Sequence, residues 1–139
     1  MAIVKWSEWY EFGIPVIDAQ HRTLFGILNR FHEAIQEGRE SEQVGLTLDH
    51  LLDYTVQHFA DEEAYLKAQG FPWLEEHHAE HEALMAQARS FAQRHANDPN
   101  LAWADELAAF LVEWVTHHIT DADRRYADYL KERPAPPTP

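Results

Sequence analysis

Apolar residues recur three or four positions apart along most of this chain, which is the spacing of one face of an α-helix. No stretch alternates between apolar and polar residues as a half-buried strand does. The helical pattern divides into four stretches, at about residues 18–38, 41–70, 72–97 and 99–133. Because short connections between long amphipathic helices make neighbours antiparallel, we predict an all-α fold, an up-down-up-down antiparallel four-helix bundle.

Local signals set the expected ends of the first three helices. Asp18 and Ser41 are suitable N-caps for the first two helices. Gly38 and Gly70 are expected to end these helices, and Pro72 to begin the third.

Two segments lie outside the helical pattern. Residues 1–17 combine aromatic residues with Gly13 and Pro15, which predicts an ordered N-terminal loop arm that packs on the core. Residues 134–139 are rich in proline and predict a disordered tail. We therefore expect one domain, the bundle at residues 1–133.

Composition narrows the range of functions. The chain has 139 residues and a formal net charge of −13, which makes nucleic acids and anionic membranes poor candidate partners. It contains no cysteine, which excludes disulfides, thiolate metal sites and iron–sulfur clusters. There is no run of about eighteen apolar residues and no pattern of a secretory signal, so we expect no membrane insertion and a cytoplasmic location.

Several of the ten histidines fall on the core-facing stripes. The polar residues that continue these stripes, one set per helix, are His21, His58 with Glu62, His77 with His81, and His118. The two paired sets have a spacing of four, which places both side chains of a pair on one helical face. The sets lie at the start, end, start and end of successive helices, so antiparallel packing brings them to one end of the bundle. The histidines expected at the surface are His32, His50, His78, His95 and His117.

Polar groups in a bundle core need a partner that replaces the lost water. A buried polar group without one costs about 1–3 kcal/mol, and an unpaired carboxylate such as that of Glu62 costs more. A metal site shared by all four helices would compensate for this cost. Structural zinc takes four ligands, and calcium and magnesium prefer oxygen. Copper accepts imidazole, but carboxylates that bridge two ions favour a pair of iron ions.

The order and spacing of these residues match a known pattern. The series His21, His58-x3-Glu62, His77-x3-His81 and His118-x4-Asp123 resembles the haemerythrin family, specifically the single-domain bacteriohaemerythrins. The flanking residues agree with this resemblance over about residues 6–130, notably Ile17-Asp18-Ala19-Gln20 before His21, Phe59 after His58, and Trp114 and Ile119 around His118.

The resemblance implies a non-haem centre of two iron ions, joined by an oxo or hydroxo bridge, that binds O2 reversibly. The residues that would hold the ions are His77, His81 and His118 for one, His21 and His58 for the other, and Glu62 and Asp123 as bridges. This set leaves one open position on the second iron, where O2 would bind.

The second bridging carboxylate has two candidates. A spacing of five turns Asp123 by about 140° from His118 on a regular α-helix, whereas Asp121 is three residues away and closer in phase. Asp121 also forms an i, i+4 pair with His117. The resemblance favours Asp123, and this choice predicts a π-bulge or local unwinding between residues 118 and 123.

An apolar wall would protect such a centre from water and anions. The residues expected to form the wall of this O2 pocket are Leu24, Leu28, Phe59, Trp114 and Val115. The same side chains would also serve in ordinary core packing.

The expected function is O2 storage, transport or delivery without enzymatic activity, with an unidentified protein as recipient of the O2. One alternative is an O2- or redox-sensing module that acts on a partner in trans. Another is a di-iron oxidase or peroxidase. Oxidase bundles use Glu-x-x-His motifs from two helices, and this chain has only Glu75-x-x-His78, in which His78 lies off the stripe.

Overall fold

The computed structural model describes residues 4–38, 41–94 and 102–132, which contain helices and no strand. The long helices are α1 (Pro15–Gln36), α2 (Ser41–Ala68), α3 (Leu74–Arg94), α4 (Ala102–His118) and the shorter α5 (Arg124–Glu132). A 3-10 turn, η1 (Glu8–Tyr10), precedes them, and a π-helical turn, η2 (Ile119–Asp123), joins α4 to α5.

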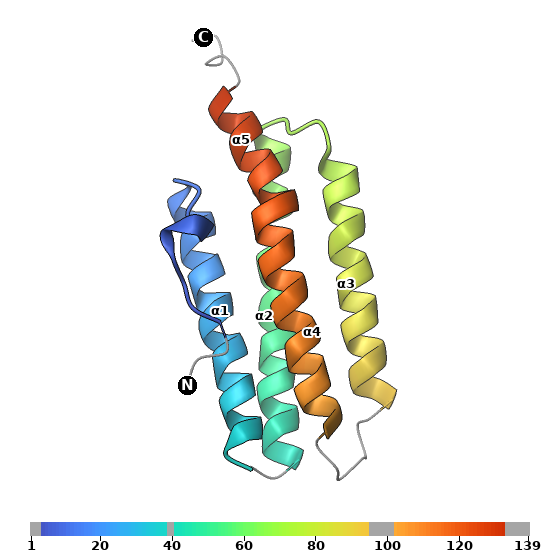
Figure 1. Ribbon diagram of the computed structural model, residues 1–139. Helices are drawn as coiled ribbons and strands as arrows, with labels where there is room; N and C mark the ends of the chain where they lie inside the picture. The colour runs from blue at the N-terminus through green and yellow to red at the C-terminus, as the bar shows by residue number, and fades with distance from the viewer. Residues whose placement is uncertain (1–3, 39–40, 95–101, 133–139) are drawn as a thin grey trace.

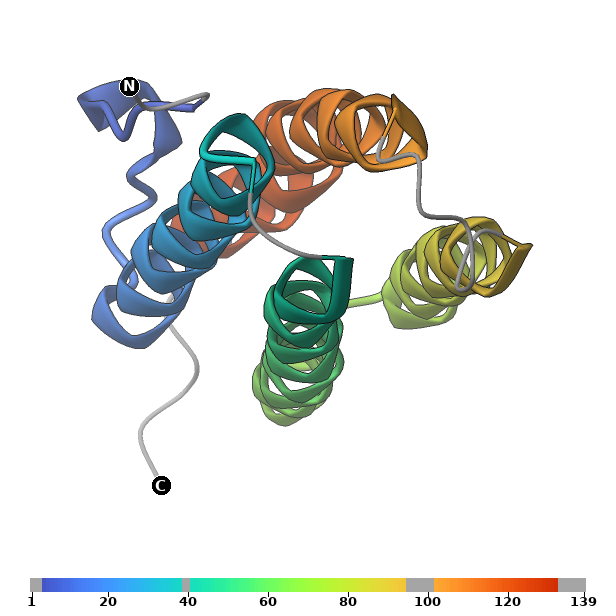
Figure 2. The same cartoon turned by 90° about the horizontal axis from the view of Figure 1, so that it is seen from below.

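The helices form the predicted antiparallel four-helix bundle. α1 packs against α2 and α4, and α3 packs against the same two helices. Viewed along the bundle, the helices occupy the four corners of a quadrilateral (Figure 2). α4, η2 and α5 follow one another as one long rod, so α5 extends the fourth corner (Figure 1).

Some predicted helix ends are wrong by a few residues. α1 begins at Pro15 rather than Asp18, because the fixed φ of proline suits a first helical turn. The Asp18 carboxylate instead accepts the backbone N–H groups of Phe12 and Gly13, at 3.0 and 3.1 Å. α3 begins at Leu74, after a turn that contains the predicted first residue.

The prediction that glycines end the first two helices is confirmed. Gly38 and Gly70 follow α1 and α2 with φ of 67° and 70°, in the left-handed region that favours glycine. The predicted end of the third helix near residue 97, the predicted start of the fourth near residue 99 and the predicted tail at residues 134–139 lie outside the described residues.

The N-terminal arm lies alongside α1 (Figure 1). The Val4 backbone N–H donates to Asn29 Oδ1 at 3.0 Å, and Asn29 Nδ2 donates to the Val4 carbonyl at 2.8 Å. Further along, the buried Phe12 ring packs edge-on against the rings of His21 and Tyr126, with centroids 5.7 and 5.9 Å away. The arm therefore covers the end of the bundle where His21 lies.

The core consists of buried aliphatic and aromatic side chains from all four corners of the bundle. Among the helices that the structure describes, none combines the length and apolar character needed to cross a bilayer.

Candidate metal centre

The structure brings seven polar side chains together inside the bundle. They are His21 from α1, His58 and Glu62 from α2, His77 and His81 from α3, His118 from the end of α4, and Asp123 from η2. All seven are buried, and even the most accessible, His118, is only 6% exposed. Antiparallel packing places these sequence-distant residues at one level.

The Glu62 carboxylate lies between two groups of histidines. Its Oε1 is 2.7 Å from His77 Nε2 and 3.1 Å from His81 Nε2. Its Oε2 is 3.3 Å from the Nε2 atoms of both His21 and His58. Each oxygen of this carboxylate therefore faces a different group of imidazoles.

The Asp123 carboxylate divides its oxygens in the same way. Oδ1 is 3.0 Å from the Nε2 atoms of both His77 and His118, and Oδ2 is 3.3 Å from His21 Nε2. The two carboxylates thus connect a three-histidine group (His77, His81, His118) with a two-histidine group (His21, His58).

The π-helical turn explains how Asp123 reaches the centre. The Arg124 N–H bonds to the carbonyl of Ile119, five residues earlier, as in a π-helix. This geometry confirms the predicted irregularity between residues 118 and 123. The competing Asp121 is 63% exposed and lies 3.9 Å from His117 Nε2, away from the cluster.

A glutamine fixes the orientation of one imidazole in the two-histidine group. Gln20 Nε2 donates to Asp61 Oδ2 at 3.0 Å, which turns its Oε1 towards His58 Nδ1, 2.7 Å away. His58 Nδ1 therefore carries the proton and donates to Gln20. The other ring nitrogen, Nε2, is left to face the cluster.

Carboxylates fix the orientation of two imidazoles in the three-histidine group. His81 Nδ1 donates to Glu63 Oε2 at 2.9 Å, and His118 Nδ1 lies 3.3 Å from Glu80 Oε2. The other oxygen of Glu63 contacts the half-exposed His78. Such outer partners are typical of histidines that bind metal through the opposite nitrogen.

The convergence of Nε2 atoms fits a bound cation. With the proton on Nδ1, the Nε2 atoms of neutral imidazoles present lone pairs to one another and to carboxylate oxygens. His81 Nε2 and His118 Nε2, for example, are only 3.1 Å apart. Lone pairs at this separation repel unless a proton or a metal ion lies between them. The donor set of imidazole nitrogens and carboxylate oxygens suits a first-row transition metal.

The buried imidazoles and carboxylates of the cluster shift one another's pKa values. Burial by itself lowers the pKa of an imidazole, but hydrogen bonds with Asp123 and Glu62 raise the pKa of His21 to about 9 and that of His77 to about 10. Burial raises the pKa of a carboxyl, yet the surrounding histidines hold the pKa of Glu62 and of Asp123 well below the usual range. Without metal, protons on imidazoles compensate the carboxylates, and a metal ion would displace them.

Tyr126 adds a hydrogen-bond donor that sequence patterns did not identify. Its hydroxyl donates to Glu62 Oε2 at 3.1 Å, and its ring packs against His77 with centroids 5.4 Å apart. Burial and the nearby Glu62 and Asp123 carboxylates raise its pKa well above the usual range, so the hydroxyl keeps its proton.

Two of the predicted pocket residues stack on imidazoles. The Phe59 ring lies parallel to that of His81, with centroids 3.6 Å apart. The Trp114 ring lies nearly parallel to that of His118, at 4.4 Å. These aromatic rings cover the three-histidine group on its outer side.

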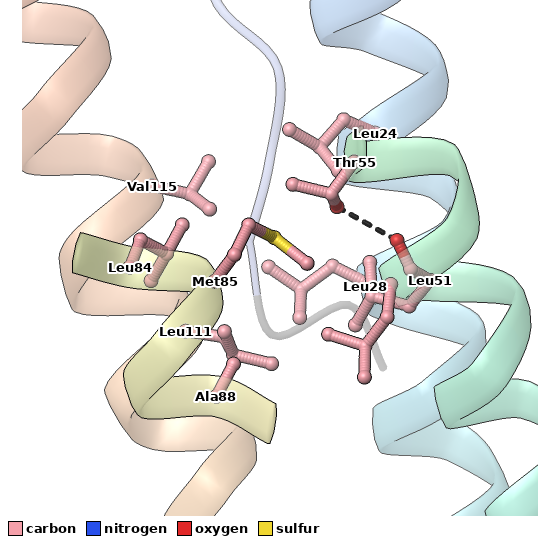
Figure 3. A pocket seen from close by; sticks show the side chains of 10 residues that line it. Leu24, Leu28, Leu51, Thr55, Leu84, Met85, Ala88, Leu111 and Val115 are labelled. Carbon is pink, nitrogen blue, oxygen red and sulfur yellow. Dashed lines mark hydrogen bonds between the residues drawn. The ribbon is translucent and has the colours of Figure 1, made fainter. Parts of the chain in front are cut away.

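The other three predicted pocket residues line a small cavity. Leu24, Leu28 and Val115 contribute to its wall, together with Leu84, Met85 and Leu111 (Figure 3). The Thr55 hydroxyl also borders it but donates to the Leu51 carbonyl at 2.7 Å (Figure 3). The cavity is apolar and has room for about one molecule of the size of water.

The outer partners Gln20, Glu63 and Glu80 were not predicted from the sequence. Each is the immediate neighbour of a cluster residue but contacts a histidine on an adjacent helix, because successive helical residues point about 100° apart. A polar residue directly beside a ligand position is the sequence signal that would have indicated them.

The histidines outside the cluster behave differently from one another. His50, His78 and His117 are exposed as predicted, whereas His32 is partly buried, so the prediction of a surface position is wrong for that residue. His95 lies outside the described residues.

Comparison with known proteins agrees with this geometry. The family model described as "Hemerythrin HHE cation binding domain" matches residues 13–130. The chain belongs to the haemerythrin family. The family model's description as a cation-binding domain accords with the buried cluster of imidazoles and carboxylates, which could hold metal.

Individual haemerythrins match over nearly the full chain. A bacteriohemerythrin of Stenotrophomonas maltophilia is 34% identical over 131 residues, which cover 94% of this chain and 84% of the relative. One of Methylococcus capsulatus is 32% identical over 133 residues, covering 94% and 98%. A wild-type hemerythrin crystal structure superposes with a TM-score of 0.82 at 27% identity, covering 93% of this chain and 98% of the other.

Proposed function

We propose that this haemerythrin binds O2 reversibly at a non-haem di-iron centre and serves in O2 storage, transport or delivery rather than as an enzyme. The proposed ligands are His77, His81 and His118 for one iron, His21 and His58 for the other, and Glu62 and Asp123 as bridges. Two iron ions, joined by an oxo or hydroxo group, would supply the electrons and the open coordination position that reversible O2 binding requires.

The division of the carboxylate oxygens supports a pair of ions most directly. Glu62 and Asp123 each direct one oxygen to the three-histidine group and the other to the two-histidine group. A single ion would contact only one oxygen of each carboxylate, whereas two ions, one in each group of histidines, would be bridged by both carboxylates. The two-histidine group offers one imidazole fewer, which leaves room for an external ligand.

The surrounding side chains keep the centre dry and fixed. Phe59 and Trp114 cover the imidazoles on which they stack. Tyr126 donates to Glu62 and limits its movement. Together they exclude water and anions from the side of the centre where the three-histidine group lies.

Loading with ferrous iron under anaerobic conditions tests the proposal. We expect two iron ions per chain by metal analysis, and an absorption band that forms with O2 and disappears when O2 is removed. Asp123→Asn should lose iron and the reversible band, while Asp121→Asn, its exposed neighbour, serves as the matched control and should retain both. A single ion per chain, or bound zinc, would contradict the proposal.

Two further measurements on the same iron-loaded protein separate the alternatives. Irreversible oxidation with continued consumption of a reductant would support an oxidase or peroxidase. O2-dependent binding of another protein to this chain would support a sensing module or a recipient of O2.

A further inference from the structure

A surface groove lies between α2 and α3, on the outer side of the metal centre. Its apolar residues include Val56 and Ala60 of α2 and Met85 and Ala86 of α3. Glu63, His78, Glu82 and Arg89 also line it, so the groove is only partly apolar. It is open to solvent, so dissolved O2 reaches it.

One side chain separates this groove from the internal cavity. Within the described part of the chain, Met85 is the only residue that lines both. It is 8% exposed, and Figure 3 shows its side chain extending into the cavity towards Leu28. Methionine has three rotatable side-chain bonds and no branch, so it changes rotamer more easily than the leucines around it.

The cavity lies one helical turn below the cluster on every side. Leu24 and Leu84 come one turn after His21 and His81, and Thr55 and Val115 come one turn before His58 and His118. His81 also lines the groove, where the Phe59 ring stacks on it with centroids only 3.6 Å apart. The cavity, in contrast, adjoins the groove at Met85.

We propose that Met85 is the gate through which O2 passes between the α2–α3 groove and the cavity beneath the metal cluster. This inference rests on the proposed O2-binding function and specifies its access route. The apolar wall selects an uncharged diatomic gas over water or anions, because water in such a cavity finds too few polar partners.

A gate has a kinetic signature that a ligand contact lacks. The molecule crosses the same barrier on entering and on leaving, so a change at the gate alters both rate constants by the same factor. The ratio of the two, which is the dissociation constant, stays unchanged. A residue that contacts bound O2 would change the dissociation constant instead.

The test compares Met85→Ala with Leu111→Ala, which enlarges the same cavity from the α4 side without opening the wall to the groove. Stopped-flow mixing of iron-loaded, reduced protein with O2 gives the association rate, and mixing of oxygenated protein with an O2 scavenger gives release. We expect Met85→Ala to raise both rates about tenfold, and Leu111→Ala to change them by less than about twofold. Equal acceleration by the two variants, or unchanged rates for Met85→Ala, would overturn the proposal.

Met85→Leu covers the case in which the alanine variant does not fold. Leucine has nearly the same volume but fewer rotamers, so both rates should fall together. A Met85→Leu protein with wild-type rates would count against a gate.

A readout without metal separates this inference from the proposed function. Dissolved O2 is paramagnetic, and we expect it to enhance the relaxation of the Leu28 methyl protons more than those of Leu66, which is equally buried but lies outside the cavity. No excess at Leu28 would contradict the access route even if iron-loaded protein binds O2. An excess at Leu28 in a protein whose iron centre shows no reversible band would contradict the proposed function alone.

Discussion

Tyr126 is the side chain that connects the aromatic packing to the charged cluster. Its hydroxyl is buried, protonated and 3.1 Å from Glu62 Oε2, and no water is needed to satisfy it. We expect Tyr126→Phe to lower the free energy of unfolding of the metal-free protein by about 1–2 kcal/mol, because Glu62 loses a donor in a buried site. Denaturant titration measures this change.

Tyr129→Phe is the matched control, since the Tyr129 ring packs against Phe71 and Trp73, away from Glu62. Its effect should stay within about 0.5 kcal/mol. Equal losses for the two variants would mean that the contact with Glu62 contributes nothing specific.

Gln20 and Gln57 offer a comparison of the same kind for metal affinity. Both amides donate to Asp61, but only Gln20 also accepts the Nδ1 proton of His58. We expect Gln20→Ala to weaken iron binding by about 10–100-fold, because His58 loses the partner that fixes its ring. Gln57→Ala should bind iron as the parent does, and competition with a chelator measures both. A similar loss in both variants would implicate Asp61 rather than the imidazole.

Helical periodicity explains why cluster residues could be predicted and their outer partners could not. A polar residue on an apolar stripe, such as Glu62 or His81, is visible in one sequence because the stripe defines the direction of the core. The partner of an Nδ1 atom depends on how two helices are rotated against each other. Glu63 and Glu80 therefore remain ordinary surface residues until the packing is known.

At the scale of elements, the π-helical turn η2 is the feature that completes the centre. It holds one residue more than a regular helical turn, so the flanking α4 and α5 keep their phase while Asp123 turns inward. This turn was predictable because the spacing between His118 and Asp123 conflicts with a regular helix. The start of α1 was not predictable, because Asp18 is suited both to an N-cap and to a contact with the N-terminal arm.

Deletion of a residue distinguishes this turn from the regular helix beside it. Deleting Asp121 should convert η2 to an α-helical turn and leave the following residues in phase, so most iron binding and the thermal midpoint should be retained. Deleting Glu113, an exposed residue of α4, rotates one half of the helix by about 100° against the other and should abolish iron binding. Metal analysis and circular dichroism report both. Equal damage from the two deletions would mean that η2 does not absorb a change in register.

At the scale of the whole molecule, the bundle maintains a charged cluster that is stable only when its charges are compensated. The chain is strongly acidic, with 24 acidic against 11 basic residues, and two of its carboxylates lie at the centre of the core. Folding therefore has to bring in either protons or metal ions with these carboxylates. The stability of the metal-free protein should consequently depend on pH in a defined direction.

The pKa values of His21 and His77 set this direction. In the folded protein they are raised to about 9 and about 10, from 6.5, so between these limits the folded state holds more protons than the unfolded state. The stabilisation is complete below about pH 6.5 and is lost as the pH rises through about 9–10. The Glu62 and Asp123 carboxyls act oppositely, since their pKa values are lowered, and their stabilisation is lost as the pH falls below about 4.5.

We therefore expect the metal-free protein to be most stable between about pH 4.5 and 6.5, and to lose about 1–3 kcal/mol per pH unit above that range. Denaturant unfolding at a series of pH values measures this dependence. Glu62→Gln removes one of the carboxylates that raise both histidine pKa values, so its profile should be flatter above pH 6.5. Iron-loaded protein should instead release its metal on acidification, because protons then compete with iron for the imidazoles. A metal-free protein whose stability does not fall between pH 7 and 9 would show that these histidines are neutral in the folded state.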